Sequence, residues 1–173
     1  MSTALNIRIS AAGELQCDDR ACRCALGWGG VRVDKREGDG ATPVGRFPLR
    51  RVLYRPDRLS APTTRLPVAA LAPDDGWCDD PADPQYNKLV RLPCTARHEE
   101  LWRADALYDV IVVIGHNDAP VVAGMGSAIF MHLASSDYRP TQGCVALARQ
   151  DLLHIVARAG PDTVLEIAAP AIR

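Results

Sequence analysis

Proline is distributed unevenly along this 173-residue chain, and this constrains the fold more than any other feature. Nine of the thirteen prolines lie between Pro43 and Pro93. Proline interrupts helices and the central strands of sheets, so this stretch is expected to form short edge strands and ordered loops. Because it also contains Trp77 and several valines, it is not a disordered linker. We interpret residues 54–95 as a loop-rich insertion or flap that lies on a sheet.

The remaining sequence is dominated by patterns typical of β-strands. Residues 109–115 (DVIVVIG) are apolar and β-branched almost throughout, which predicts a central strand buried on both faces. Elsewhere, apolar or alternating segments bounded by turn residues favour further strands. These predicted strands cover residues 5–9, 32–35, 49–54, 128–133 and 163–167.

One amphipathic helix is predicted over residues 148–158. Apolar residues such as Leu152 and Val156 fall on one face, and the Gly160-Pro161 pair is a good stop signal. The order of strands, one helix and a final strand predicts a mainly β fold with a helix packed against it. The chain length fits a single domain that spans residues 1–173.

Composition and charge exclude several classes of partner. The chain is 47% hydrophobic and 24% charged, and its formal net charge is −1. Because no acidic or basic block stands out, nucleic acid and anionic membranes are not expected as partners. The N-terminal residues MSTALNIRIS show no signal peptide, and no apolar run is long enough to cross a bilayer. Taken literally, this predicts a soluble cytoplasmic monomer, unless an export signal was removed.

The six cysteines do not form a recognisable metal or disulfide pattern. Cys22 and Cys24 are closer together than a usual zinc pair, and no second pair at ligand spacing accompanies them. The chain is also too long for a disulfide-dense miniprotein. We therefore interpret the cysteines other than Cys144 as small apolar residues with at most one bridge, and we expect no metal.

Two residues in segment 130–147 (FMHLASSDYRPTQGCVAL) can act together as nucleophile and base. His132 lies in a predicted apolar strand, and Cys144 follows a turn just before the predicted helix. A neighbouring histidine, or a helix start at the thiol, lowers a cysteine pKa by about one to five units and supplies a thiolate. The thiolate would attack a carbonyl to give a thioester, with His132 moving the protons. Residue types alone leave a second interpretation open, in which both are structural core residues.

Two stretches of the chain resemble a known family. Residues 141–147 (TQGCVAL), with His132 upstream, resemble the active-site segment of the L,D-transpeptidases, the YkuD-like family. Residues 39–47 (DGATPVGRF) resemble the TPxGxF motif that comes early in the same catalytic domain. Both occur in the right order, and the resemblance covers roughly residues 31–167. It is closest to a compact proteobacterial subgroup with a GCVAL motif.

The resemblance implies a β-sandwich or irregular barrel with the cysteine in a groove and one helix after it. It implies no metal or organic cofactor. The substrate would be a peptidoglycan stem peptide, cut after an L-centre diamino acid. The acyl group would pass from the thioester to the side-chain amine of a second stem peptide, the acceptor. Such a reaction implies a location in the periplasm or cell wall.

The sequence departs from the common family pattern beside the nucleophile. Gln142 stands where many members have a histidine, and Ala146 stands where many have an arginine. The loop from His132 to Cys144 is also shorter than in typical members. Some substrate contacts must therefore differ, and a cross-link of non-standard 1,3 type, formed at the first stem residue, stays open.

Further residues complete the candidate oxyanion- and substrate-binding set. His116 either contacts the oxyanion or substrate, or forms a turn. Thr141 either orients His132 or contacts substrate, or its hydroxyl caps the loop. Arg149 either holds a substrate carboxylate or is solvated on the helix. His98 is interpreted as a surface residue. The full set is Gly143, His116, Thr141, Gln142, Ser127, Tyr138 and Arg149.

Three functions follow from these residues. The first is a transpeptidase that joins stem peptides, and the second is an L,D-carboxypeptidase or endopeptidase that uses the same Cys-His pair. The third is a catalytically silent peptidoglycan-binding module that retains the fold.

Overall fold

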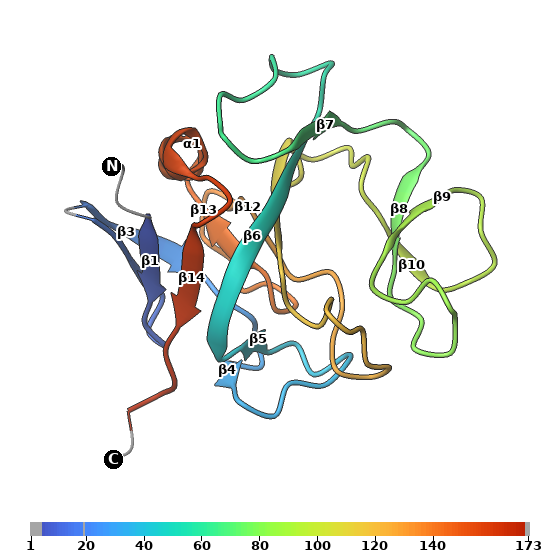
Figure 1. Ribbon diagram of the computed structural model, residues 1–173, viewed down its shortest axis with the longest axis horizontal. Coiled ribbons are helices and arrows are strands. Elements are labelled where there is room, and N and C mark those ends of the chain that lie inside the picture. The colour runs from blue at the N-terminus through green and yellow to red at the C-terminus, as the bar shows by residue number, and fades with distance from the viewer. Residues whose placement is uncertain (1–4, 19, 172–173) are drawn as a thin grey trace.

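The computed structural model describes residues 5–18 and 20–171 (Figure 1). The first four residues, which belong to the segment inspected for an export signal, lie outside this range. Within the described part of the chain, no helix has the length and apolar character needed to cross a membrane.

Short strands make up most of the regular structure. In chain order, the elements are β1 (Asn6–Ile9), β2 (Glu14–Cys17), β3 (Arg20–Ala25), β4 (Val31–Arg32), β5 (Thr42–Pro43), β6 (Gly45–Tyr54), β7 (Val68–Ala70), β8 (Asp75–Cys78), β9 (Leu89–Arg91), β10 (His98–Glu100), β11 (Val110–Ile114), β12 (Phe130–Leu133), β13 (Val145–Leu147), α1 (Arg149–Arg158) and β14 (Val164–Ile167).

The largest sheet closes into a barrel. Its strands follow the order β11-β12-β13-β3-β2-β1-β14-β6-β7, and a further pairing between β11 and β6 joins the sheet to itself. The long strand β6 makes this closure possible, since its first half pairs with β14 and its second half pairs with β11. The prediction of a mainly β fold with one helix is confirmed, in the form of a closed barrel.

Strand β11 separates two hydrophobic cores. All five of its residues are buried. Successive side chains of a strand point to opposite faces. Val110, Val112 and Ile114 therefore pack into the main core, while Ile111 and Val113 pack into a second core. The prediction of a strand buried on both faces is confirmed, because each face of β11 meets a different core.

The second core is covered by a small sheet from the proline-rich part of the chain. Strands β10, β8 and β9 form a separate three-stranded sheet, called the flap sheet below. It lies to the right of the barrel in Figure 1. Trp77 of β8 packs edge-on against Phe130 of β12, with 5.0 Å between the ring centroids. Strands β7 to β10 are three or four residues long, as expected for a proline-rich stretch. The ten-residue strand β6 differs from the short edge strands predicted there, because it contains Pro48 and pairs with β14, β11 and β7.

Two local predictions differ from the structure. The strand predicted at residues 32–35 ends at Arg32, because the next residues form a loop in which Lys35 and the Asp39 carboxylate are paired. The structure also inserts β13 between Cys144 and the helix. The helix begins at Arg149, as predicted to within one residue, so a helix start at the thiol, one of the two ways considered for lowering its pKa, is not present. Strand β13 was missed because three apolar residues are too few to show a period.

We predict that Ile111→Ala lowers the free energy of unfolding by about 2–5 kcal/mol, because it leaves a cavity in the second core. Ile111 is fully buried in this core. Val33→Ala serves as the control, since Val33 is 78% exposed and its change should stay within about 0.5 kcal/mol. Denaturant unfolding measures both. Equal losses would contradict the role assigned to β11.

Candidate active site

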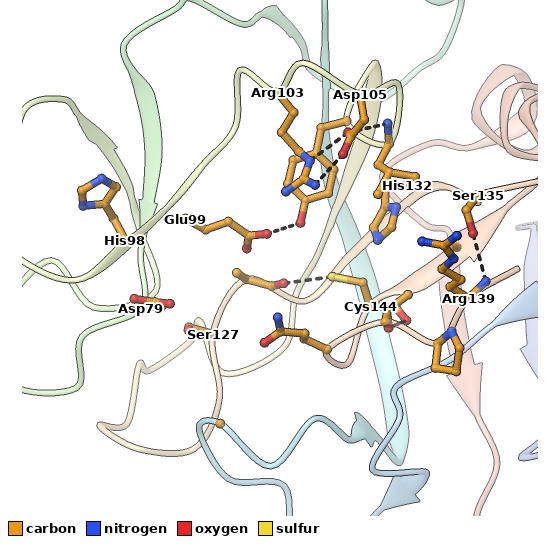
Figure 2. Close-up of a pocket in the computed structure, with 18 of the residues that line it drawn as sticks. Asp79, His98, Glu99, Arg103, Asp105, Ser127, His132, Ser135, Arg139 and Cys144 are labelled. Atoms are coloured by element: carbon orange, nitrogen blue, oxygen red, sulfur yellow. Dashed lines mark hydrogen bonds and ion pairs between the residues drawn. The ribbon is translucent and has the colours of Figure 1, made fainter.

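A cavity of about 740 Å³ lies between the barrel and the flap sheet. The barrel side contributes Cys144, His132 and Tyr108, and the flap side contributes His98 and Glu99. Figure 2 shows the His132 ring and the Cys144 side chain on the same side of this pocket, with Glu99 reaching in from the opposite side. The cysteine and histidine predicted to act together are therefore brought into one pocket.

Cys144 is held by hydrogen bonds to the chain segment that leads into β12. Its thiol donates to the Ala128 carbonyl at 3.2 Å, and the Phe130 amide donates to the sulfur at 3.4 Å. The Thr141 hydroxyl donates to the Cys144 carbonyl at 2.7 Å and accepts the Gly143 amide at 3.1 Å. Thr141 therefore caps the turn that carries Cys144. The N–H of Gly143, a member of the candidate oxyanion- and substrate-binding set, donates to this cap.

The turn before Cys144 packs directly on the other stretch identified in the sequence. Gly143 has φ +129°, a conformation that side chains rarely adopt, and a β-carbon there would lie 2.7 Å from the Ala41 carbonyl oxygen. Nearby, the Gly27 amide donates to the Thr42 hydroxyl at 2.9 Å. Residues 39–47 therefore form the surface against which the turn before Cys144 is placed.

His132 is oriented by its own strand. Its Nδ1 lies 2.8 Å from the Leu133 carbonyl oxygen, which can only accept. Nδ1 is therefore the protonated nitrogen of the neutral ring, and Nε2 is left with a lone pair that can accept a proton. The Tyr108 ring packs edge-on against the imidazole with 5.1 Å between centroids, which limits rotation of the ring.

The resting pair is neutral, which differs from the thiolate expected from sequence. Burial raises the pKa of the Cys144 thiol to about 12 and lowers the pKa of His132 to about 4. Both groups avoid charge because they are only 7% and 5% exposed. The arrangement therefore suits a reaction in which the imidazole removes the thiol proton as the sulfur attacks.

The other predicted residues separate into two groups. Ser127, Thr141 and Gln142 line the pocket, although the Ser127 hydroxyl donates to Glu37 at 2.7 Å. The remaining residues make contacts elsewhere. His116 lines a separate cavity of about 260 Å³ and lies 3.0 Å from the Met125 carbonyl. Tyr138 packs under the Arg23 guanidinium. Arg149 is exposed on α1 and lies 3.7 Å from Asp109.

In residues 5–18 and 20–171, no cluster of three or more histidine, cysteine, aspartate or glutamate residues is arranged to hold an ion. Cys22, Cys24, Cys78, Cys94 and Cys144 are free thiols.

Comparisons with known proteins place the chain in a family. Residues 15–167 match the YkuD family, described as the L,D-transpeptidase catalytic domain. The chain belongs to this family. No curated protein sequence gives a significant match.

Solved structures with a similar arrangement include L,D-transpeptidase 1 of Mycobacterium tuberculosis, at 13% identity and a TM-score of 0.40, where the match covers 96% of this chain and 62% of that one. An L,D-transpeptidase from Mycobacterium smegmatis is 12% identical with a TM-score of 0.41, covering 95% and 58% of the two chains. The helical cell shape determining protein Pgp2 of Campylobacter jejuni is 14% identical with a TM-score of 0.42, covering 98% and 49%. The chain thus spans about half to three-fifths of the lengths of these proteins.

This YkuD domain has pocket residues that the sequence did not reveal. Glu99, Arg103 and Tyr108 line the cavity, and so does His98, which had been interpreted as a surface residue. Glu99 and His98 lie on the three-residue strand β10, whose pattern is too short to indicate a face. The pairing of β11 with β12 brings Tyr108 beside His132, and this register is visible only in the folded chain. Ala146, where many family members have arginine, also lines the pocket.

We predict that Gly143→Ala destabilises the protein by about 1–3 kcal/mol more than Gly124→Ala, because only the former drives a β-carbon into the Ala41 backbone. Both glycines have positive φ, but nothing lies within 4 Å of a β-carbon at Gly124. The control therefore also has a positive φ, at +80°, but lacks the clash. Denaturant unfolding measures the difference, and equal losses would show that the contact with residues 39–47 is unimportant.

The neutral state of His132 predicts a pH-dependent stability. Between pH 4 and pH 6.5 the unfolded chain binds a proton on this residue and the folded protein does not. The free energy of unfolding therefore falls as the pH is lowered through this window. Because a shift of one pKa unit corresponds to about 1.4 kcal/mol, the shift of His132 lowers the free energy of unfolding at low pH by about 3 kcal/mol. We expect His132→Gln to remove this pH-dependent decrease. Urea unfolding at a series of pH values tests it, and parallel pH profiles for the two proteins would refute it.

Proposed function

We propose that this chain is a peptidoglycan L,D-transpeptidase in which Cys144 is the nucleophile and His132 is the general base. The observation that carries the proposal is the placement of both side chains in one cavity, with Nε2 of His132 free to accept a proton. Membership of the YkuD family supports stem peptides as the substrate class. The flap sheet forms the opposite wall of the cavity, so the donor peptide would bind between the flap and the barrel.

The first half of the proposed reaction forms a thioester. Sγ of Cys144 attacks the carbonyl carbon of the donor stem, while its proton passes to His132 Nε2. The carbon–nitrogen bond then breaks, and the imidazolium returns the proton to the leaving amine. Because the resting pair is neutral, the imidazolium exists only during the step, and the pocket does not have to store two opposite charges.

The second half transfers the acyl group. The amine of an acceptor stem attacks the thioester, the carbon–sulfur bond breaks, and the amine proton travels through His132 to the sulfur. Water in place of the amine would give hydrolysis with the same two residues. The proposal covers cross-links at different stem positions, including the non-standard 1,3 type. Analysis of the reaction products identifies which position is used. The proposal also requires an extracytoplasmic location, such as the periplasm, and fits the compact GCVAL-containing subgroup.

We predict that Cys144→Ala abolishes cross-linking of purified muropeptide monomers while leaving the fold intact, because alanine nearly fills the site but has no nucleophile. Cys24→Ala is the matched control, since Cys24 is also buried but lies on β3 outside the cavity lining. Mass spectrometry of the products separates dimers from trimmed monomers and identifies the bond formed.

The outcomes separate the three functions. Dimers formed by the wild type and by Cys24→Ala, but not by Cys144→Ala, would support the proposal. Trimmed monomers without dimers would assign the chain to hydrolysis. An inert wild-type protein that retains muropeptides would indicate a binding module, and dimer formation by Cys144→Ala would refute the nucleophile.

A further inference from the structure

One acidic side chain in the cavity has no role in the reaction described above. Glu99 lies on β10, the flap strand that pairs with β8. Figure 2 shows its side chain extending from the flap into the pocket, toward the side where Cys144 lies. The acid therefore faces the nucleophile from the opposite wall.

The two carboxylate oxygens of Glu99 have different surroundings. Oε1 accepts a hydrogen bond from the buried Tyr108 hydroxyl. Tyr108 in turn packs edge-on against His132, so it connects the flap acid to the catalytic base. Among the described residues, no donor is recorded on Oε2. One oxygen is thus held in place and the other remains available to a ligand.

Arg103, the cation whose charge acts on this carboxylate, is paired with another acid. It forms two hydrogen bonds to Asp105, at 2.9 and 2.6 Å. Lys35, which also lines the cavity, is paired with Asp39. Glu99 therefore has no ion-pair partner in the described part of the chain, although the charge of Arg103 favours its ionised form. Consistent with this, the charge of Glu99 contributes to the raised pKa of the Cys144 thiol, after burial.

A fixed carboxylate with a free oxygen, in a partly desolvated pocket, suits a cationic hydrogen-bond donor. In the proposed reaction the acceptor is an amine, which in water is an ammonium ion with a pKa of about 10.4 for a lysine-type group. An ammonium ion cannot attack a thioester until it loses a proton. Transfer by amine therefore needs a group that binds the cation and takes its first proton, whereas hydrolysis by water does not.

We propose that Glu99 is the acceptor-binding residue, which holds the ammonium group of the second stem beside the thioester and removes its first proton. This inference rests on the proposed function. The proton moves from nitrogen to Oε2, giving a neutral amine and a carboxylic acid. The amine then forms the carbon–nitrogen bond, and its second proton passes through His132 to the departing sulfur. Glu99 returns its proton to solvent when the product leaves.

The surroundings of Glu99 favour this transfer. Burial raises the pKa of its carboxyl group, which makes it a better proton acceptor than an exposed glutamate. Tyr108 keeps its proton because burial raises its own pKa well above the usual value, so it continues to donate to Oε1. Tyr108 is therefore a positioning residue for both Glu99 and His132.

The test is the partition between joining and hydrolysis in Glu99→Gln, which keeps the shape and removes the charge. With purified muropeptide monomers as donor and acceptor, we expect dimer formation to fall at least about tenfold. The amount of thioester on Cys144, measured by intact-protein mass spectrometry, normalises both rates, because the charge of Glu99 also acts on the thiol. Per thioester formed, the dimer rate should fall and the hydrolysis rate should not, so that the ratio of dimers to hydrolysis products falls about tenfold. Glu100→Gln is the matched control, since Glu100 lies on the same strand, is exposed and does not line the cavity.

A second acceptor separates charge recognition from a general disturbance of the fold. Hydroxylamine is uncharged at neutral pH, so Glu99→Gln should transfer the acyl group to it at the wild-type rate. Glu99→Asp, which keeps the charge, should recover part of the dimer formation. An unchanged ratio of dimers to hydrolysis in Glu99→Gln, or equal losses with hydroxylamine and muropeptide acceptors, would overturn the inference. Absence of any thioester on the wild-type protein would overturn the proposed function itself, and the inference with it.

Discussion

The close contact between two backbone segments, at Gly143 and Ala41, is the constraint on which the active site depends. A β-carbon at Gly143 would approach the Ala41 carbonyl oxygen to 2.7 Å, so only glycine allows the nucleophile turn to rest on this loop. The Thr141 hydroxyl then closes the turn by bonding to the Cys144 carbonyl and the Gly143 amide. Two stretches about one hundred residues apart in the sequence are thereby combined into one rigid support for a single sulfur atom.

The two-sided burial of β11 gives the site its electrostatic character. One face of this strand fills the barrel, and the other face, with Cys144 nearby, lies in the core beneath the flap sheet. Cys144 is therefore part of a hydrophobic core as well as part of a cavity wall. Burial at this position favours the neutral thiol and the neutral imidazole, an environment that suits the proposed proton transfer coupled to attack.

Much of the fold could be predicted where the pattern was long or chemically distinctive. The apolar run of β11 and the amphipathic face of α1 extend over enough residues to show their burial. The short strands β8, β9, β10 and β13 contain three or four residues each, and their pairing rather than their composition makes them strands. In the same way, Glu99 could not be assigned to the site, because β10 reaches the pocket only through its pairing with β8.

The sequence by itself determined the family, the mainly β architecture and the candidate pair Cys144 and His132, because each depends on residue type and order along the chain. Only the tertiary structure decided the protonation state of that pair and the capping role of Thr141. It also decided that Glu99 and Tyr108 line the pocket and that His116 and Arg149 do not. The physical reason is that pKa values and hydrogen-bond partners depend on desolvation and on neighbours brought together from distant segments. These quantities come into existence only when the barrel has closed and the flap sheet covers its outer face.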